Sequence, residues 1–333
     1  RENKNVLLDS GTSINYDQLV VATGSLHSYF GNDEWSNYSK GLKGINDALV
    51  IRENLLKAFE KAENETDQEI KQEFLNFVVI GGGPTGVEMA GSIAEIAYKT
   101  LNKEFNNFNS DDPNVYLIEA NDKLLPMFSK KLSDKAEQYL NDFGVKVLKN
   151  EKVTNVNLSN VETDKRTIKS RNIIWAAGNT ASSLIGKLNT VTDDNGRAIV
   201  DPDCSLKDDP DVFVIGDASN HKDTSNTPLP GIAPVAMQQG KYVGKIIKNK
   251  ILKMDRKPFK FSDKGMMATV GKYKAIGKIG NIEVSGFIAW VFWSVIHIVY
   301  LIGYRSKLLV IIEWIFSYLF NKKGTRLIYR EEI

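Results

Sequence analysis

Three glycines that follow an apolar run constrain the fold of this chain more than any other feature. Residues 77–80 are continuously apolar, as expected for a strand buried on both faces of a sheet. Gly81, Gly83 and Gly86 follow at once in the spacing G-x-G-x-x-G, and a helix is predicted after them, to about residue 104. A second apolar strand at residues 115–118 completes a strand–helix–strand unit of a parallel sheet.

At each of these three positions, glycine is needed for a separate physical reason. Gly81 allows a tight turn, Gly83 lets the backbone approach a pyrophosphate, and Gly86 lets the helix pack closely on the strand. The helix that begins around Pro84 and Thr85 presents free N–H groups and a positive dipole end to phosphates. The loop therefore predicts a dinucleotide-binding site, with a purely structural glycine turn as the alternative.

An acidic residue, Glu119, ends the second strand. Dinucleotide-binding folds place the acid that binds the adenosine ribose there, although Glu119 lies further along than the usual spacing of about 20 residues. A carboxylate that binds both ribose hydroxyls repels a 2′-phosphate, which favours NADH over NADPH. The alternative is an ordinary solvated acid at a strand end. A second acid, Glu88, lies on the first turn of the helix after the loop, where a favourable interaction with the helix dipole would also explain it.

A second nucleotide site is predicted from two other strand ends. Ala22, Thr23 and Gly24 end a short apolar strand, and Gly216 and Asp217 end another. The glycine loop that such a site needs is not in this chain, which begins at Arg1 in the middle of a pattern, so we expect a segment to be missing before it.

A helix that begins near Pro234 belongs with this second site. Residues 236–239, which include Ala236, Gln238 and Gln239, would face the site from the positive end of the helix dipole. Such an end suits the anionic reduced form of a flavin.

Composition excludes several classes of function. Lys plus Arg number 43 and Asp plus Glu 41, so the charge is too balanced for a nucleic-acid-binding protein. A single cysteine, Cys204, excludes a disulfide framework, a redox pair and a thiolate metal site. Three scattered histidines argue equally against a metal site. Redox chemistry on this chain would need a bound cofactor.

The C-terminal part predicts membrane association. Residues 284–304 carry no formal charge and are long enough to span a bilayer, but Ser285, Ser294 and His297 argue against spanning. In residues 308–320, Glu313 interrupts the apolar run, which suits a helix lying in the interface. Two buried core helices or a dimer seam are the alternatives. The interfacial aromatic and head-group-binding side chains would be Trp290, Trp293, Tyr300, Tyr304, Trp314, Arg305, Lys307, Lys322, Lys323 and Arg326.

Taken in order along the chain, these features resemble the type II NADH dehydrogenases, the single-subunit NADH:quinone oxidoreductases that do not pump protons. Any one motif is shared with flavin disulfide reductases generally, whereas the C-terminal tail and the helix that carries Gln238 and Gln239 are typical of a narrower group of proteins. The segments that carry the resemblance are 79–88, 175–178, 214–217, 233–240 and the Trp- and His-rich tail that closes in 326–328.

The resemblance implies an α/β fold with two Rossmann-like dinucleotide-binding domains, of which the FAD domain is incomplete and the NADH domain complete, plus a C-terminal membrane-associated helical region. The predicted segments are 1–48 for the first part of the FAD domain, 49–75 for a helical connector, 76–180 for the NADH domain, 181–256 for the return of the FAD domain, and 257–333 for the membrane-associated region.

The resemblance also assigns site residues. Glu88 would lie near the nicotinamide and flavin rings, and Gln238 beside the quinone entrance; both are predicted to be catalytic. Many members have Gln where this chain has Pro234, so the quinone-linked role of that position is not transferred. NADH would be held by Gly81, Gly83, Pro84, Thr85, Gly86, Glu119 and Gly178, and FAD by Ala22, Thr23, Gly24, Gly216, Asp217, Ala236 and Gln239.

The function implied is FAD-dependent oxidation of NADH with transfer of two electrons to a membrane quinone, without proton pumping and without a metal. The protein would be peripheral, on the cytoplasmic face of the inner membrane, in contact with the bilayer surface. A homodimer through the tail is left open, because no residue indicates it. Two alternatives stay open: a flavin reductase with a soluble acceptor, and a nucleotide-binding membrane protein without turnover.

Overall fold

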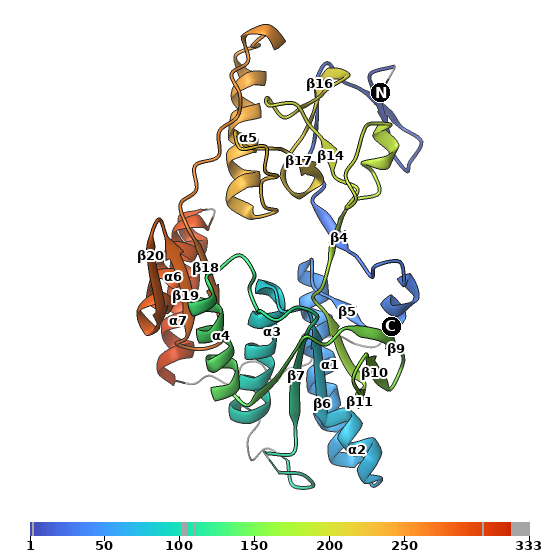
Figure 1. Ribbon diagram of the computed structural model, residues 1–333, viewed down its shortest axis with the longest axis vertical. Helices are drawn as coiled ribbons and strands as arrows, with labels where there is room; N and C mark the ends of the chain where they lie inside the picture. The colour runs from blue at the N-terminus through green and yellow to red at the C-terminus, as the bar shows by residue number, and fades with distance from the viewer. Residues whose placement is uncertain (2, 101–104, 110, 302, 321–333) are drawn as a thin grey trace. The chain divides into compact units, whose positions relative to one another are not determined.

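The computed structural model describes residues 1, 3–100, 105–109, 111–301 and 303–320 (Figure 1). Its internal contacts divide the chain into two compact units. The first combines Arg1–Ser28 with Asn179–Asp263, and the second combines Tyr29–Gly178 with Lys264–Ile333. The chain thus leaves the first unit after Ser28 and returns to it at Asn179; the five segments outlined from the sequence remain a prediction.

The second unit is built on a five-stranded parallel sheet in the order β5-β12-β6-β7-β8. Every residue of β6 is buried, as its continuous apolar run predicted. The dinucleotide loop follows the carboxyl end of this central strand. The strands are β5 (Lys40–Gly41), β6 (Asn76–Ile80), β7 (Asn114–Glu119), β8 (Val145–Lys149) and β12 (Asn172–Trp175).

The two faces of this sheet are covered differently, because successive side chains of a strand point to opposite faces. Phe77 and Val79 pack against α1 (Ile45–Asn64), α3 (Pro84–Glu95) and α4 (Lys130–Asp142). Val78 and Ile80 pack against an antiparallel meander and the short helix η1. The elements of that face are β9 (Val153–Val156), β10 (Asn160–Thr163), β11 (Thr167–Lys169) and η1 (Asp33–Asn37).

Two predicted helices have other bounds in the structure. The helical connector predicted for residues 49–75 is divided into α1, which begins earlier at Ile45, and α2 (Gln68–Leu75). The Asp67 carboxylate caps α2 by accepting the N–H groups of Glu69 and Ile70, at 2.8 and 3.2 Å, which starts a new helix there. The helix after the glycine loop continues as a π-helical segment, η2 (Ile96–Thr100), and the predicted end at residue 104 lies outside the described residues.

The first unit contains two adjacent parallel strands and one long helix. Strands β3 (Leu19–Val21) and β16 (Asp209–Val214) pair in parallel, and β15 (Ser205–Leu206) pairs antiparallel with β16. Helix α5 runs over Ala233–Lys248, close to its predicted bounds. The remaining elements are β1 (Asn5–Leu7), β2 (Ser13–Asn15), β4 (Ser25–His27), β13 (Asn179–Ala181), β14 (Ala198–Ile199), β17 (Ser219–Asn220), η3 (Gly186–Leu188), η4 (Gly216–Ala218) and η5 (Lys253–Asp255).

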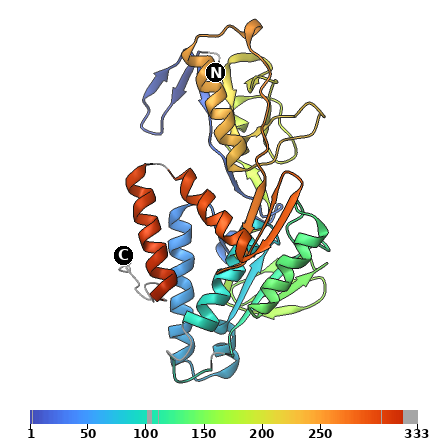
Figure 2. The ribbon, with the colours of Figure 1, turned by 90° about the vertical axis from the view of Figure 1, so that its left-hand side faces the viewer.

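The C-terminal part of the second unit is a three-stranded antiparallel sheet followed by two helices (Figure 2). These are β18 (Met266–Thr269), β19 (Ala275–Ile279), β20 (Ile282–Gly286), α6 (Phe287–Tyr300) and α7 (Tyr304–Phe320). The first three residues of the uncharged segment that begins at residue 284 therefore belong to β20. Among the described residues, no helix combines the length and the hydropathy needed to cross a membrane. Lys322, Lys323 and residues 326–328 lie outside the described part.

Candidate functional site

Two of the loop glycines are required by close backbone packing. Gly81 has φ +111°, and a Cβ on it would lie 2.8 Å from the backbone of Ala176, which follows the neighbouring strand β12. A Cβ on Gly86 would lie 1.8 Å from the carbonyl oxygen of Gly81. The geometry thus agrees with the tight turn and the close helix–strand packing inferred from the sequence. Gly178, with φ +68°, ends the segment that follows β12.

Gly83 is different, because nothing in its surroundings requires a glycine. Its φ is −75°, and a Cβ built on it meets no atom within 4 Å. It caps α3, with Pro84 at the first helical position and Thr85 exposed beside it. The open space at this helix N-terminus fits a group that approaches the backbone closely, as a dinucleotide pyrophosphate would.

Glu119 is tied to the glycine loop. Its Oε2 accepts the backbone N–H of Gly82 at 2.7 Å, and its Oε1 accepts both the backbone and the side-chain N–H of Asn121, at 2.8 and 2.6 Å. The structure thus brings Glu119 and the loop together at the carboxyl ends of β6 and β7. The contribution of Asn121 was not predicted, although an amide two residues after the acid is a local signal for such a turn.

Glu88 lies deeper in its helix than the sequence indicated. It is the fifth residue of α3 rather than a first-turn acid, so interaction with the helix dipole does not explain it. Its Oε1 accepts the backbone N–H of Thr269 at 3.3 Å. Burial raises the pKa of Glu88 above its ordinary value, and the hydrogen bonds from Thr269 oppose this only in part. Glu88 is therefore a carboxyl group that can hold a proton nearer to neutral pH than an exposed glutamate can.

The two strand ends assigned to the second nucleotide site meet in the first unit. Val21 and Val214 are paired in parallel, so Ala22–Gly24 and Gly216–Asp217 emerge at the same edge. The hydroxyl of Ser25 donates to Asp217 Oδ2 at 2.9 Å and fixes the direction of that carboxylate. Ser25 was not predicted, because its partner is 192 positions away and no local pattern marks the pair.

The two adjacent glutamines of α5 have different partners. Gln239 is fully buried, and its Oε1 accepts the N–H of Gly216 at 2.7 Å. Its Nε2 is buried with no hydrogen-bond partner among the described residues. An unpaired buried donor beside the Gly216 turn, with Ala236 packed closely on that turn, fits a site that takes a further acceptor-bearing group such as a flavin nucleotide.

Gln238 points elsewhere. Its Nε2 donates to the carbonyl oxygen of Ser262 at 3.0 Å, and its Oε1 accepts the N–H of Ser262 at 2.9 Å. Both amide atoms are thus engaged by the backbone of the segment that follows η5. The catalytic role predicted for Gln238 remains a prediction.

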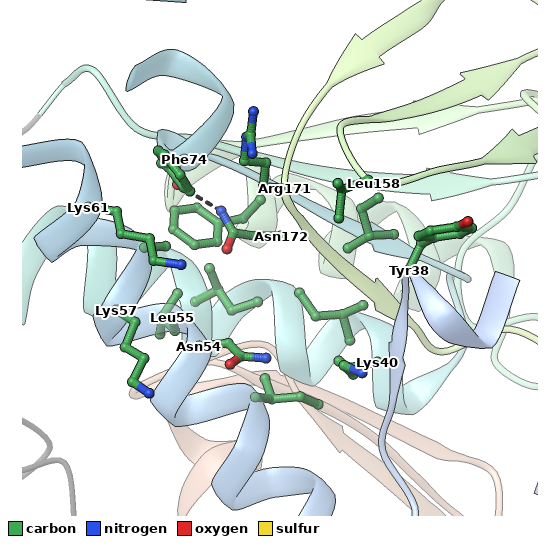
Figure 3. A pocket seen from close by; sticks show the side chains of 16 residues that line it. Tyr38, Lys40, Asn54, Leu55, Lys57, Lys61, Phe74, Leu158, Arg171 and Asn172 are labelled. Carbon is green, nitrogen blue, oxygen red and sulfur yellow. Dashed lines mark hydrogen bonds between the residues drawn. The ribbon is translucent and has the colours of Figure 1, made fainter. Parts of the chain in front are cut away.

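A cavity of about 300 Å³ lies in the second unit, away from the glycine loop (Figure 3). Its walls come from α1 and from the first residues of β6 and β12, and no residue of the predicted sites lines it. Three of its cations are already engaged. Lys57 pairs with Glu53 at 2.9 Å, Arg171 pairs with Glu73 at 2.8 Å, and Lys61 lies over the Phe74 ring.

The described residues hold no group of three or more His, Cys, Asp or Glu side chains that could bind a metal ion. Cys204 is fully buried, and burial raises the pKa of its thiol to about 12.

Comparison with known proteins decides between the family assignments. Residues 1–240 match the family model for pyridine nucleotide-disulphide oxidoreductases, and residues 264–323 match that for the NDH2 C-terminal domain. The chain is 40% identical to the type II NADH:quinone oxidoreductase Ndh of Mycobacterium tuberculosis, over 93% of this chain and 68% of that protein. It is 38% identical to NdhA of the same organism, over 96% of this chain and 70% of that protein. The chain belongs to the type II NADH:quinone oxidoreductases.

A solved structure has the same fold. NDH2 of Plasmodium falciparum, determined in complex with NADH, has a TM-score of 0.88 at 21% identity and covers 99% of this chain and 83% of that one. This likeness and the family models confirm the predicted α/β fold with its C-terminal helical region. The resemblance of the sequence to type II NADH dehydrogenases is confirmed as well.

Proposed function

We propose that this chain oxidises NADH and transfers two electrons to a quinone, as its membership of the type II NADH:quinone oxidoreductases indicates, and that its own carboxylates bind and orient the reactants. NADH and FAD are the cofactors. Bound FAD supplies the two-electron chemistry that connects NADH to the quinone. The observation that carries the assignment of residues is the open space at Gly83 beside the loop-bound carboxylate of Glu119.

On this proposal, the NADH pyrophosphate binds at the N-terminus of α3, where Gly83 leaves the backbone accessible. Glu119, already oriented by Gly82 and Asn121, accepts hydrogen bonds from the adenosine ribose. In the first unit, Asp217 and the Nε2 of Gln239 hold the flavin nucleotide. Each unit thus has one glycine turn and one oriented carboxylate for one nucleotide.

Glu88 is the residue we assign to proton handling. Reduction of a quinone to a quinol consumes two protons, and a carboxyl group with a raised pKa can hold one at its Oε atom at a higher pH than an exposed carboxyl group can. Glu88→Gln should slow turnover while leaving the bound flavin spectrum intact. Unchanged kinetics of this variant would remove Glu88 from the mechanism.

The decisive measurement is an anaerobic absorbance trace of the protein purified from its natural host. NADH is added first, and a short-chain quinone second. We expect bleaching near about 450 nm on NADH addition and recovery on quinone addition. Bleaching without recovery would show that the acceptor is a soluble one, and the absence of a flavin spectrum would contradict the assignment of the FAD-binding residues.

We further propose that α6 and α7 bind the surface of a lipid bilayer and that the protein is peripheral, on the cytoplasmic face of the inner membrane. Stacked rings of Trp293 and Trp314, with centroids 5.8 Å apart, join the two helices. Their outward apolar side chains are at least 39% exposed on α6. Residues Ile288, Val295 and Val299 of α6 and Leu308, Ile312 and Ile315 of α7 follow helical spacing and form what we call the apolar face.

Vesicle flotation tests this membrane proposal. Replacing Ile288, Val295 and Ile312 by serine should weaken binding to phosphatidylglycerol-containing vesicles by at least about tenfold, because each side chain contributes apolar burial. Leu158→Ser is the matched control, since Leu158 is an equally exposed apolar residue of the same unit outside the apolar face. Undiminished flotation, together with a dimer that the triple variant converts to a monomer, would assign the apolar face to a second copy of the chain instead.

A further inference from the structure

One face of α3 is occupied by the last residue of β18 and by the turn that follows it. Glu88, Gly91 and Glu95 lie at positions i, i+3 and i+7 of this helix and so share a face. Strand β18 contacts α3. The residues that contact this face are consecutive, running from Thr269 to Lys272.

Three contacts define the arrangement. Glu88 Oε1 accepts the backbone N–H of Thr269 at 3.3 Å, and Glu95 Oε1 accepts that of Lys272 at 2.9 Å. Between them, a Cβ on Gly91 would lie 3.0 Å from the carbonyl group of Val270, a residue that is itself fully buried. The backbone of residues 269–272 therefore lies directly on α3, with a carboxylate at each end of the contact.

The two hydrogen bonds differ in strength. At 2.9 Å the Glu95 bond has the usual N–H···O length, whereas the Glu88 bond at 3.3 Å lies just beyond the usual range. Thr269 is also held from the other side by β18, where it pairs with Ala275 of β19. The N–H of Lys272, three residues further along, is fixed by the shorter bond.

We propose that Glu95 is a positioning residue for Glu88: by holding the backbone of Lys272 on α3, it keeps the N–H of Thr269 within reach of the Glu88 carboxylate. The proposal rests on the proton-handling role proposed for Glu88. Glu95 itself is half-buried and interacts with the charges of Lys99 and Lys272, whereas Thr269 supplies the hydrogen bonds to Glu88. Nothing about this position follows from the nucleotide loop, which lies at the other end of the helix.

The first arm of the test is structural and independent of activity. Glu95→Ala in the complete protein should increase hydrogen exchange at the amides of Thr269 and Lys272 by at least about tenfold, because the backbone bond that fixes the segment is lost. Glu95→Gln retains a carbonyl oxygen as acceptor and should restore protection. Undiminished protection at the Thr269 amide in Glu95→Ala would overturn the proposal, whatever the exchange at Lys272, because the Lys272 amide loses its own acceptor in this variant.

The second arm is the pH dependence of NADH:quinone turnover. A carboxylate that loses an N–H donor becomes easier to protonate, so Glu95→Ala should move the pH midpoint governed by Glu88 upward by about half a unit or more. Loss of the negative charge alone would move it the other way, because a neighbouring negative charge raises a carboxyl pKa. Glu95→Gln, which loses the charge and keeps the acceptor, should therefore leave the midpoint unchanged or slightly lowered. A midpoint that moves equally in both variants would contradict the positioning role.

Glu88→Gln separates failure of the inference from failure of the proposed function. If this variant abolishes the pH midpoint, Glu88 governs it, and an unshifted midpoint in Glu95→Ala overturns the positioning role. If the midpoint persists in Glu88→Gln, the proton-handling role of Glu88 is wrong. The exchange measurement then decides alone whether Glu95 holds Thr269 against Glu88.

Discussion

The backbone N–H of Gly82 lies 2.7 Å from Glu119 Oε2, so the middle of the glycine loop is hydrogen-bonded to the end of the neighbouring strand. The other carboxylate oxygen is held by Asn121. Glu119 is therefore not the solvated strand-end acid that the sequence left as an alternative. If Glu119 binds the ribose as proposed, its direction is fixed beforehand, which lowers the entropy lost on binding.

Replacing Glu119 tests its assignment to the ribose. Glu119→Ala should raise the KM for NADH by about tenfold, because the ribose hydroxyls lose their acceptor, while the KM for NADPH changes little or falls. The preference for NADH over NADPH should therefore decrease. Glu119→Gln is the control for loop geometry, since its carbonyl oxygen can still accept from Gly82. Steady-state kinetics with both cofactors measure the preference, and an unaltered ratio in Glu119→Ala would refute the ribose assignment.

Substitutions at two glycines of the loop should have different effects, one on NADH binding and the other on folding. Gly83→Ala should fold normally, because its Cβ points into open space, yet weaken NADH binding by at least about tenfold through contact with the pyrophosphate. Gly86→Ala should instead destabilise the fold by several kcal/mol, since its Cβ would overlap the carbonyl oxygen of Gly81. Thermal melts and NADH titrations of both variants provide the comparison. Normal NADH affinity in a folded Gly83→Ala variant would contradict the pyrophosphate site.

The parts of this site that the sequence predicted are those determined by neighbouring residues. The buried run of β6, the glycine spacing and Glu119 lie within one strand–helix–strand unit, so their mutual geometry follows from standard local conformations. The break between α1 and α2 was local too, but the capping role of Asp67 was not recognised within a charged, helix-like stretch. The residues on both sides of Asp67 favour a helix, so the sequence did not show that a new helix starts there.

The parts that the sequence did not predict depend on tertiary contacts. Thr269 is 181 positions from Glu88, and Ser25 is 192 positions from Asp217, so no spacing rule connects them. Gln238 and Gln239 are adjacent, and composition alone does not say which faces the Gly216 turn. The helical phase of α5 decides it: Gln239 is buried against that turn and Gln238 binds Ser262.

The single cysteine should be inert in the native protein. Burial, assisted by the nearby Asp203 carboxylate, raises the pKa of Cys204 to about 12, so the thiolate fraction at pH 8 is on the order of one in ten thousand. We expect no labelling by iodoacetamide until the protein is unfolded in guanidinium chloride, where one equivalent should react. Mass spectrometry measures both. Prompt labelling of the native protein would show that the first unit opens readily around β15 and β16.

The stability of the first unit should depend on pH through Asp203. This buried carboxylate bonds Lys253 at 2.9 Å and Arg256 at 3.0 Å. Burial by itself would raise its pKa, but the hydrogen bonds from Lys253, Ser205 and Arg256 outweigh burial and lower it. A carboxyl pKa that is lower in the folded than in the unfolded state contributes stability above the ordinary carboxyl pKa, and that contribution is lost as the pH falls through the folded value.

Asp203→Asn should therefore lower the free energy of unfolding by about 2–4 kcal/mol at pH 7, because the Arg256 guanidinium stays buried without its partner charge. The difference from the wild type should shrink as the pH falls below about 4, since the wild-type stability that comes from the Asp203 charge is lost progressively as the pH approaches the lowered folded pKa. Asp134→Asn is the control: Asp134 pairs with Lys130 on the surface, and this variant should unfold at the wild-type denaturant concentration. Urea unfolding at several pH values measures all three proteins. A deficit in Asp203→Asn that stays constant from pH 7 to pH 3 would show that packing, rather than charge, holds η5 against β15.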